Sequence, residues 1–272
     1  MKNNRFQSGR FRRRLGFRFL DLAFNESVWR RRELDCLGMN LKNSVALVTG
    51  GSSGIGQGIA KSLIESGARV AITGRDKAKL DKAAKELGAH PIQADVSKEA
   101  DAQRTMRETL EKFGDLHVLV NNAGLGAFKK LVDFDLASFE RTFATNVTGA
   151  MLMAREAARH FISKNRGNIV NIGSTASHRG APNGTAYYAS KFALRGMTEC
   201  WRQELRKNNI RVFLVNPSEV VTSFGAAAGF EQKDNASKLR PEDIAHAVKS
   251  VLEMEDRGFV TELTVFATNP LD

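Results

Sequence analysis

Cysteine and histidine are scarce in this 272-residue sequence, and their placement argues against several kinds of site. The two cysteines, Cys36 and Cys200, lie far apart and belong to no CxxC pair, which argues against a disulfide framework or a zinc site. The five histidines show no metal-ligand spacing, so we expect no metal. No apolar run is long enough for a transmembrane helix or a signal peptide, and we therefore expect a cytoplasmic protein.

Positive charge is concentrated at the start of the chain. Residues 1–38 contain ten basic and four acidic residues and so carry +6 of the net charge of +11. We interpret this segment as a basic N-terminal extension that is disordered or is not part of the core. Contact with nucleic acid or an anionic membrane is an alternative that we do not favour. The acidic residues within the segment argue against a transit peptide.

In the remainder, 39–272, short apolar runs typical of buried parallel strands alternate with helical stretches. The predicted strands are 44–49, 69–73, 117–121, 168–172, 211–215 and 262–266. The predicted helices are 77–87, 100–113, 136–164 and 187–207, with further helix starts at the turn 50–56 and at Pro241. This alternation predicts one α/β domain with a single doubly wound parallel sheet of the Rossmann type and helices on both faces. Ligands of such sheets bind beyond the carboxyl ends of the strands.

A glycine-rich turn, Gly50-Gly-Ser-Ser-Gly-Ile-Gly56, directly follows the first predicted strand. Glycine lets the backbone turn sharply and lets a pyrophosphate approach main-chain N–H groups, while the helix that starts there offers its positive end. The spacing differs from G-x-G-x-x-G and indicates a relative of that dinucleotide site, with a plain strand-to-helix connection as the alternative. The predicted cofactor contacts in this turn are Gly50, Ser52, Ser53, Gly54, Ile55 and Gly56.

Tyr187 and Lys191 stand four residues apart, and Ser174 lies thirteen residues before the tyrosine. On a helix both side chains project from the same face, where the ammonium would stabilise a tyrosinate and lower the pKa of the phenol. A phenol with a lowered pKa is a usable acid or base near neutral pH. The three residues therefore indicate a hydride-transfer site.

Taken together, these motifs resemble those of the classical short-chain dehydrogenase/reductase family, and the resemblance extends from about Asn40 to the C-terminus. Its motifs are 49–56, Asp95-Val96, 121–124, Asn146, Ser174, 187–191 and 216–222, in the family's order. It implies a nicotinamide-dependent oxidoreductase that forms a homodimer or homotetramer and acts on a small-molecule carbonyl or alcohol.

The resemblance also implies a role for each matching residue. Tyr187 would be the general acid/base, Lys191 would also hold the nicotinamide ribose, Ser174 would bind the substrate oxygen, and Asn146 would order a proton-relay water. The implied cofactor contacts beyond the glycine turn are Asp95, Val96, Asn122, Ala123, Gly124, Tyr187, Lys191, Pro217, Val220 and Thr222.

The end of the second predicted strand bears on the choice of cofactor. Gly74 occupies the position where NAD enzymes usually carry a carboxylate, and Arg75 follows, so Thr73 and Arg75 favour a pocket for the 2′-phosphate of NADP(H). The adjacent Asp76 and the neutral Ser53 leave NAD(H) open.

Substrate identity is less constrained. We expect residues 125–131, 176–186 and the substrate loop 223–239 to surround the substrate. A phosphate-bearing acyl thioester is suggested by three basic residues near this region, Lys129, Lys130 and Arg179. The β-ketoacyl reductases of the family share the catalytic set of this sequence. Those reductases commonly end in a Gly-Gly segment, which this C-terminus lacks. We therefore expect NADP(H)-dependent reduction of a ketone or aldehyde. A non-catalytic NADP-sensing or nucleic-acid-binding protein that uses the basic extension is the alternative.

Overall fold

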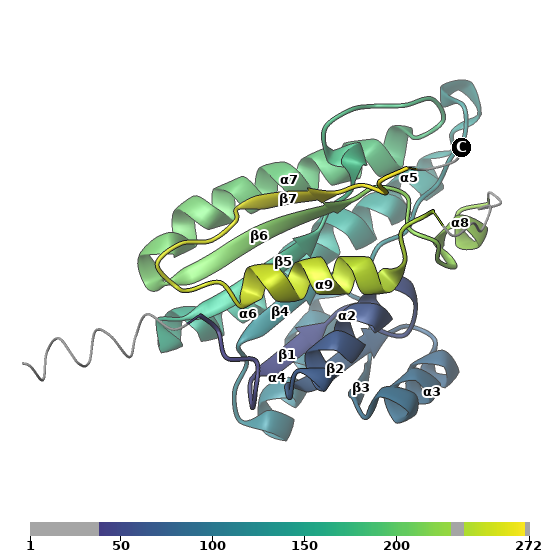
Figure 1. Ribbon diagram of the computed structural model, residues 1–272. Helices are drawn as coiled ribbons and strands as arrows, with labels where there is room; N and C mark the ends of the chain where they lie inside the picture. Colours follow the sequence, from purple (N-terminus) through teal and green to yellow (C-terminus); the bar gives the residue numbers. More distant parts are fainter. Residues whose placement is uncertain (1–37, 230–236, 270–272) are drawn as a thin grey trace, which may run out of the picture. The chain divides into compact units, whose positions relative to one another are not determined.

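A parallel β-sheet organises the residues that the computed structural model describes, 38–229 and 237–269. Its seven strands follow the order β3-β2-β1-β4-β5-β6-β7, and every neighbouring pair is parallel (Figure 1). The strands are β1 (Val45–Val48), β2 (Arg69–Gly74), β3 (His90–Gln93), β4 (Val118–Asn121), β5 (Gly167–Ile172), β6 (Ile210–Pro217) and β7 (Glu262–Val265). The chain winds outward from β1 to β3 and then returns to β4, so the topological switch lies between β1 and β4, where ligands of such sheets bind.

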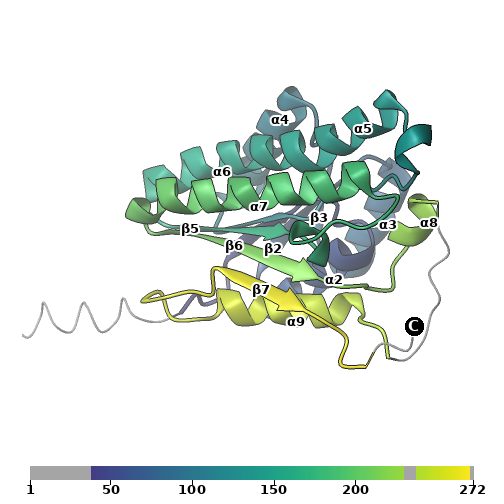
Figure 2. The ribbon, with the colours of Figure 1, turned by 90° about the horizontal axis from the view of Figure 1, so that it is seen from above.

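Helices cover both faces of the sheet (Figure 2). One face carries α2 (Gly54–Glu65), α3 (Lys77–Leu87) and α9 (Pro241–Leu252). The other carries α4 (Glu99–Phe113), α6 (Ala150–Lys164) and α7 (Thr185–Leu205). The shorter helical elements are η1 (Leu131–Asp133), α5 (Leu136–Phe143), η2 (Ala144–Gly149), η3 (Thr175–Ser177), η4 (Arg206–Asn208) and α8 (Phe224–Ala227).

Two apolar layers hold the helices to the sheet. Ile59 of α2 and Val248 of α9 pack on the first face, whereas Met153 and Phe161 of α6 pack on the second. Phe161 is fully buried, and a Cβ added to Gly167 would lie only 2.2 Å from its ring, so β5 needs a glycine at that point. Burial of each such side chain stabilises the fold by about 1.5–3 kcal/mol.

The predicted fold class is confirmed, and two details of the prediction were wrong. The strand β3 was missed, because His90-Pro-Ile-Gln93 contains a proline and buries only Ile92, as suits an edge strand. The single helix predicted over 136–164 is divided by the π-helical segment η2 between α5 and α6.

Several predictions fall wholly or partly outside the described residues. The basic extension 1–38 is described only at Gly38, and the substrate loop 223–239 is described except for residues 230–236. In the described parts of the chain, no helix has the length and apolar character needed to cross a membrane.

Candidate active site

The predicted site residues gather at the carboxyl edge of the sheet, on both sides of the switch point. Thr49 follows β1, Asn122 follows β4, Ser174 follows β5 by two residues, and Pro217 ends β6. Parallel strands bring these four positions to one edge although they are far apart in sequence.

The glycine turn between β1 and α2 has a backbone that excludes side chains. Gly50 and Gly54 have φ values of +64° and +54°, in the left-handed region. A Cβ on Gly56 would lie 2.3 Å from Asn122 Nδ2 and 2.5 Å from Gly50 O. The helix α2 begins at Gly54, and the side chain of Ser53 makes no capping hydrogen bond to its first turn. Such a glycine cradle at an uncapped helix start fits a diphosphate.

Polar side chains from β4 and β2 hold this turn. Asn122 Nδ2 donates to Thr49 O (2.9 Å) and Gly50 O (3.2 Å), and Thr49 Oγ1 accepts from the main-chain N–H groups of Asn122 and Ala123 (both 3.0 Å). Thr73 is buried, and its hydroxyl accepts from Gly50 N (3.3 Å). Asn122 and Thr73 therefore shape the cradle with their side chains, and the 2′-phosphate contact of Thr73 stays a prediction.

Beyond β2, the structure separates the roles of Arg75 and Asp76. Asp76 Oδ1 accepts from Lys79 N (3.1 Å) as the N-cap of α3. Arg75 is exposed, and its guanidinium has no hydrogen-bond or ion-pair partner in the described part of the chain. One oxygen of the Asp76 carboxylate thus caps the helix, whereas the Arg75 guanidinium is exposed to a ligand.

Asp95 and Val96 follow β3. Asp95 Oδ1 accepts from Ser97 N (3.1 Å) and Ser97 Oγ (2.7 Å), and Val96 is buried against Gly149, where an added Cβ would lie 2.6 Å from Val96 Cγ2. At the other end of the site, Thr222 lies against Gly54, with its Cβ 3.3 Å from an added Cβ. Val220, two residues earlier, bridges to Leu239.

Tyr187, Ser174 and Lys191 form the centre of the candidate site. The phenol of Tyr187 shares a side-chain hydrogen bond with Ser174. Lys191 is buried, its Nζ lies 5.8 Å from the centre of the Tyr187 ring, and it donates to Ile172 O (2.7 Å). A Cβ on Gly124 would lie 3.9 Å from this ammonium, so the turn after β4 faces it.

The electrostatics of this pair differ from the sequence-based expectation. Burial raises the pKa of the Tyr187 phenol above its ordinary value, and the hydrogen bond with Ser174 opposes that rise only in part. Burial also lowers the pKa of Lys191 to about 8. The predicted lowering of the phenol's pKa by Lys191 is therefore not found in the protein alone, where burial has the largest effect on the phenol.

Asn146 lies in η2, the segment that interrupts the predicted helix. Its Nδ2 donates to Leu125 O and Ser190 Oγ (both 2.9 Å), and its Oδ1 accepts from Leu125 N (2.9 Å). Both amide hydrogens are therefore used to tie the loop after β4 to α7. The predicted role in ordering a water stays a prediction.

A second polar layer lies behind Ser174. The main-chain N–H of Ser174 donates to Asn216 Oδ1 (3.1 Å), and Asn216 Nδ2 donates to Glu262 Oε1 (2.8 Å). His178 Nε2 lies 2.7 Å from the same carboxylate oxygen. This chain of contacts fixes the end of β5 to β6 and β7. Sequence reasoning missed Glu262, and its place within an apolar strand was the available signal.

At the rim, Lys129 forms an ion pair with Asp135 (2.6 Å), which weakens the prediction that it attracts a substrate phosphate.

Phe128 and Phe224 were not singled out in the sequence, although both contact the ring of Tyr187. Nothing in their spacing indicates that contact, which depends on the paths of two loops.

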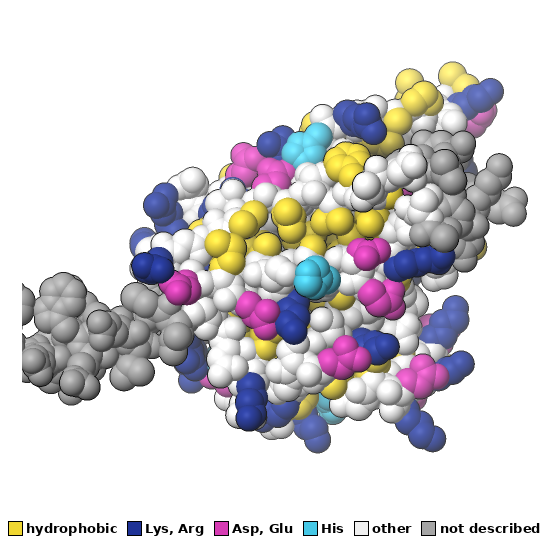
Figure 3. All heavy atoms as spheres, in the orientation of Figure 1, with side chains coloured by type: hydrophobic (Ala, Val, Ile, Leu, Met, Phe, Trp, Pro, Cys, Tyr) yellow, Lys and Arg dark blue, Asp and Glu magenta, His cyan; other side chains and the backbone are white. Residues whose placement is uncertain are grey.

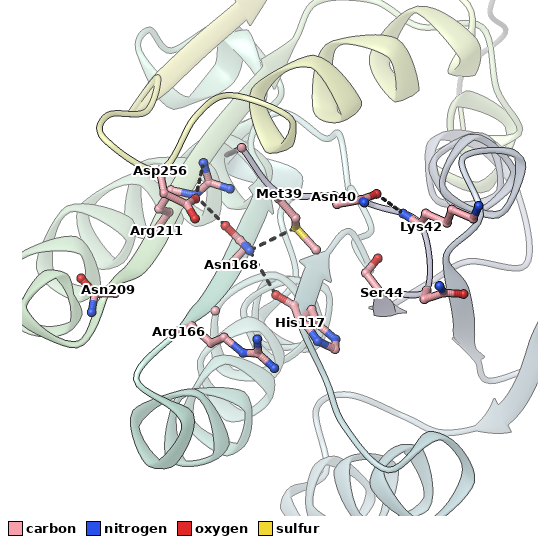
Figure 4. Close-up of a pocket in the computed structure, with 13 residues that line it drawn as sticks. Met39, Asn40, Lys42, Ser44, His117, Arg166, Asn168, Asn209, Arg211 and Asp256 are labelled. Carbon is pink, nitrogen blue, oxygen red and sulfur yellow. Dashed lines mark hydrogen bonds and ion pairs between the residues drawn. The ribbon is translucent and has the colours of Figure 1, made fainter. Parts of the chain in front are cut away.

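A pocket of about 330 Å³ lies at the opposite, amino edge of the sheet (Figure 4). Asn168 is at its centre and connects Met39 Sδ (3.3 Å), His117 O (3.2 Å) and Arg211 Nε (2.8 Å). Its central polar groups are thus joined to one another, and none belongs to the predicted catalytic or cofactor set.

The chain matches the short chain dehydrogenase family over residues 44–233. It is 31% identical over 233 residues to an uncharacterized oxidoreductase of Staphylococcus saprophyticus, with 84% of this chain and 98% of the relative covered. A solved 3-ketoacyl-(acyl-carrier-protein) reductase from Brucella melitensis complexed with NADH is 33% identical, with a TM-score of 0.79 and coverage of 84% and 98%. An alcohol dehydrogenase from the archaeon Thermococcus sibiricus complexed with 5-hydroxy-NADP is 30% identical, with a TM-score of 0.77 and coverage of 84% and 97%.

These relatives are oxidoreductases, and they give no support to a non-catalytic binding protein. The sequence match covers most of the chain, and the parallel sheet agrees with the structural similarity to the solved relatives. The chain is therefore an enzyme, an oxidoreductase that belongs to the short-chain dehydrogenase/reductase family.

Proposed function

We propose that this protein is an NADP(H)-dependent carbonyl reductase that converts a ketone or aldehyde to an alcohol, with Tyr187 as the general acid/base. The observation that carries this proposal is the convergence of Ser174, Tyr187 and Lys191 beside a glycine cradle. The solved relatives named above are complexed with NADH or with a modified NADP, which supports a nicotinamide cofactor.

The chemistry follows from the positions of the side chains. When bound, the reduced cofactor supplies the hydride that the carbonyl carbon accepts. Ser174 and Tyr187 bind the carbonyl oxygen and stabilise the negative charge that develops on it, and Tyr187 donates its proton to that oxygen. Because burial raises the pKa of Tyr187, the phenol holds its proton at neutral pH and is ready to donate it. In the reverse oxidation the same residue, as the tyrosinate, would accept the proton of the alcohol.

The same edge of the sheet would hold the cofactor. The turn from Gly50 to Gly56 would bind the diphosphate, Asp95 and Val96 the adenine end, and Thr222 the carboxamide. Lys191 uses one of its three hydrogens on Ile172 O, which leaves two for the ribose hydroxyls. Ala123, Gly124, Pro217 and Val220 would border the nicotinamide.

The preference for NADP(H) rests on Arg75. Its guanidinium is exposed at the end of β2, whereas one oxygen of the Asp76 carboxylate caps α3. An arginine at this point favours the additional 2′-phosphate.

The proposal is tested by following NADPH oxidation with a panel of simple ketones, quinones, steroids and acetoacetyl thioesters. For an accepted substrate, Tyr187→Phe should retain NADPH binding and lose about 100-fold or more in kcat, because the proton donor is removed. Tyr188→Phe is the matched control, since the residue points about 100° away around α7. Comparable turnover in wild type and Tyr187→Phe would refute the assigned mechanism, and no turnover with any carbonyl would refute the function.

We also propose that the protein forms a homodimer or homotetramer. Figure 3 shows hydrophobic side chains along the region of β7 and α9. Phe266 is exposed, and Leu263 and Val265 of the edge strand β7 are half-buried. An apolar strip at a strand edge is a suitable contact between copies. Light scattering coupled to size-exclusion chromatography measures the state directly, and a monomer would contradict the proposal.

A further inference from the structure

Two phenyl rings pack against the proposed catalytic tyrosine. The centre of the Phe128 ring lies 5.4 Å from that of Tyr187 at an interplanar angle of 46°, and Phe224 lies 5.5 Å from it at 52°. Phe128 follows β4, whereas Phe224 begins α8, so the rings come from segments far apart in the sequence. Both distances are typical of aromatic pairs.

Gly126 allows the two rings to converge. A Cβ at this position would lie 2.7 Å from Phe128 Cε2 and 2.9 Å from Phe224 Cζ, closer than real contacts allow. The loop is also tied to the segment before α7, because Lys129 N donates to Asn183 O (2.8 Å). The rings are therefore held beside Tyr187 by backbone contacts.

The carbonyl group that reacts must place its oxygen at Ser174 and Tyr187. Its substituents then lie beside the Tyr187 ring, where half-buried phenyl groups already pack. In the elements that follow Phe128, Leu131 and Val132 of η1 and Leu136 of α5 are 75%, 88% and 69% exposed. A charged substituent would lose its hydration among these groups, whereas a planar apolar one would gain ring contacts.

We propose that Phe128 and Phe224 are the walls of the substrate subsite and select aromatic ketones or aldehydes over small aliphatic ones. The inference rests on the proposed carbonyl reduction and adds a substrate class to it. It assigns specificity to two residues that take no part in proton transfer.

The experiment compares kcat/KM for acetophenone and butan-2-one, each with NADPH. Wild type should prefer acetophenone by about tenfold or more, since a phenyl group adds both buried area and ring contacts. Phe128→Ala and Phe224→Ala should each lower this preference by about fivefold, which corresponds to about 1 kcal/mol. Phe224→Tyr, which keeps the ring, should retain the preference. NADPH binding and melting temperature report whether each variant is folded.

Phe192→Ala is the matched control, because that ring lies exposed on α7 and its loss should leave the preference unchanged. An unchanged preference in both wall variants would overturn the inference, as would a wild type that prefers butan-2-one. Turnover of acetoacetyl thioesters without turnover of either ketone would overturn the inference and leave the proposed function standing. Failure with every carbonyl in the panel would overturn both.

Discussion

Lys191→Met should change how the stability of the protein depends on pH. Burial lowers the pKa of Lys191 from its ordinary value of 10.5 to about 8. Between these two values the unfolded chain binds more protons than the folded one, so the free energy of unfolding of the wild type rises with pH. From pH 7 to pH 9 this gain is about 1 kcal/mol, and the methionine variant lacks it. The variant also loses the hydrogen bond to Ile172 O, which lowers its stability at every pH.

Urea unfolding at pH 7, 8 and 9 measures the effect as a difference between variant and wild type, in which the other titrating groups cancel. The stability of the variant relative to wild type should fall by about 1 kcal/mol from pH 7 to pH 9. Lys61→Met on the exposed side of α2 is the control, because water surrounds that ammonium in both states. A difference that stays flat with pH would show that burial does not destabilise the charged form of Lys191.

Three further outcomes are expected. Arg75→Ala should weaken NADPH binding by about 1.5–3 kcal/mol, as for a lost charge-assisted hydrogen bond, and barely alter NADH binding. Fluorescence titrations measure both affinities, and an equal loss of affinity for the two cofactors would contradict the cofactor preference. Arg211→Met should lower the free energy of unfolding, measured in urea, by about 3–5 kcal/mol. The reason is that the buried guanidinium donates to Leu252 O and Met254 O (both 2.9 Å) as well as to Asn168. A decrease below about 1 kcal/mol would disprove that role. Removal of residues 1–38 should leave folding and NADPH binding largely intact by circular dichroism and titration, and an insoluble product would show that the domain boundary is misplaced.

Most of the sheet could be predicted from the sequence because parallel strands that are buried on both faces consist of continuous apolar runs. Thus β1, with Val45 to Val48 all buried, was readily found, whereas β3 contributes one buried residue and a proline. The division of the long helix at η2 had no periodic signal, since it depends on the bonds from Asn146 to Leu125 and Ser190, which are tertiary contacts.

The candidate site was predictable where motif spacing and strand ends determine position, as for Ser174 and Tyr187. It was not predictable where a side chain's partner lies on another loop or strand. Thr73 turns inward to Gly50, and Glu262 reaches Asn216 from β7. Phe128 meets Phe224 and Tyr187 where Gly126, which has no side chain, leaves room for the rings.

Gly74, at the end of β2, leaves the cofactor preference open to evolutionary change. A Cβ added there would lie 3.0 Å from Ser52 Oγ and 3.5 Å from Leu80 Cδ1, and the nearer of these atoms ends a short side chain that can rotate. Every glycine codon becomes an aspartate or glutamate codon by a single base change, and such a carboxylate would stand at the end of β2, directly before Arg75. If Arg75 selects the 2′-phosphate, a single nucleotide change at codon 74 would add a carboxylate that favours NAD(H) over NADP(H).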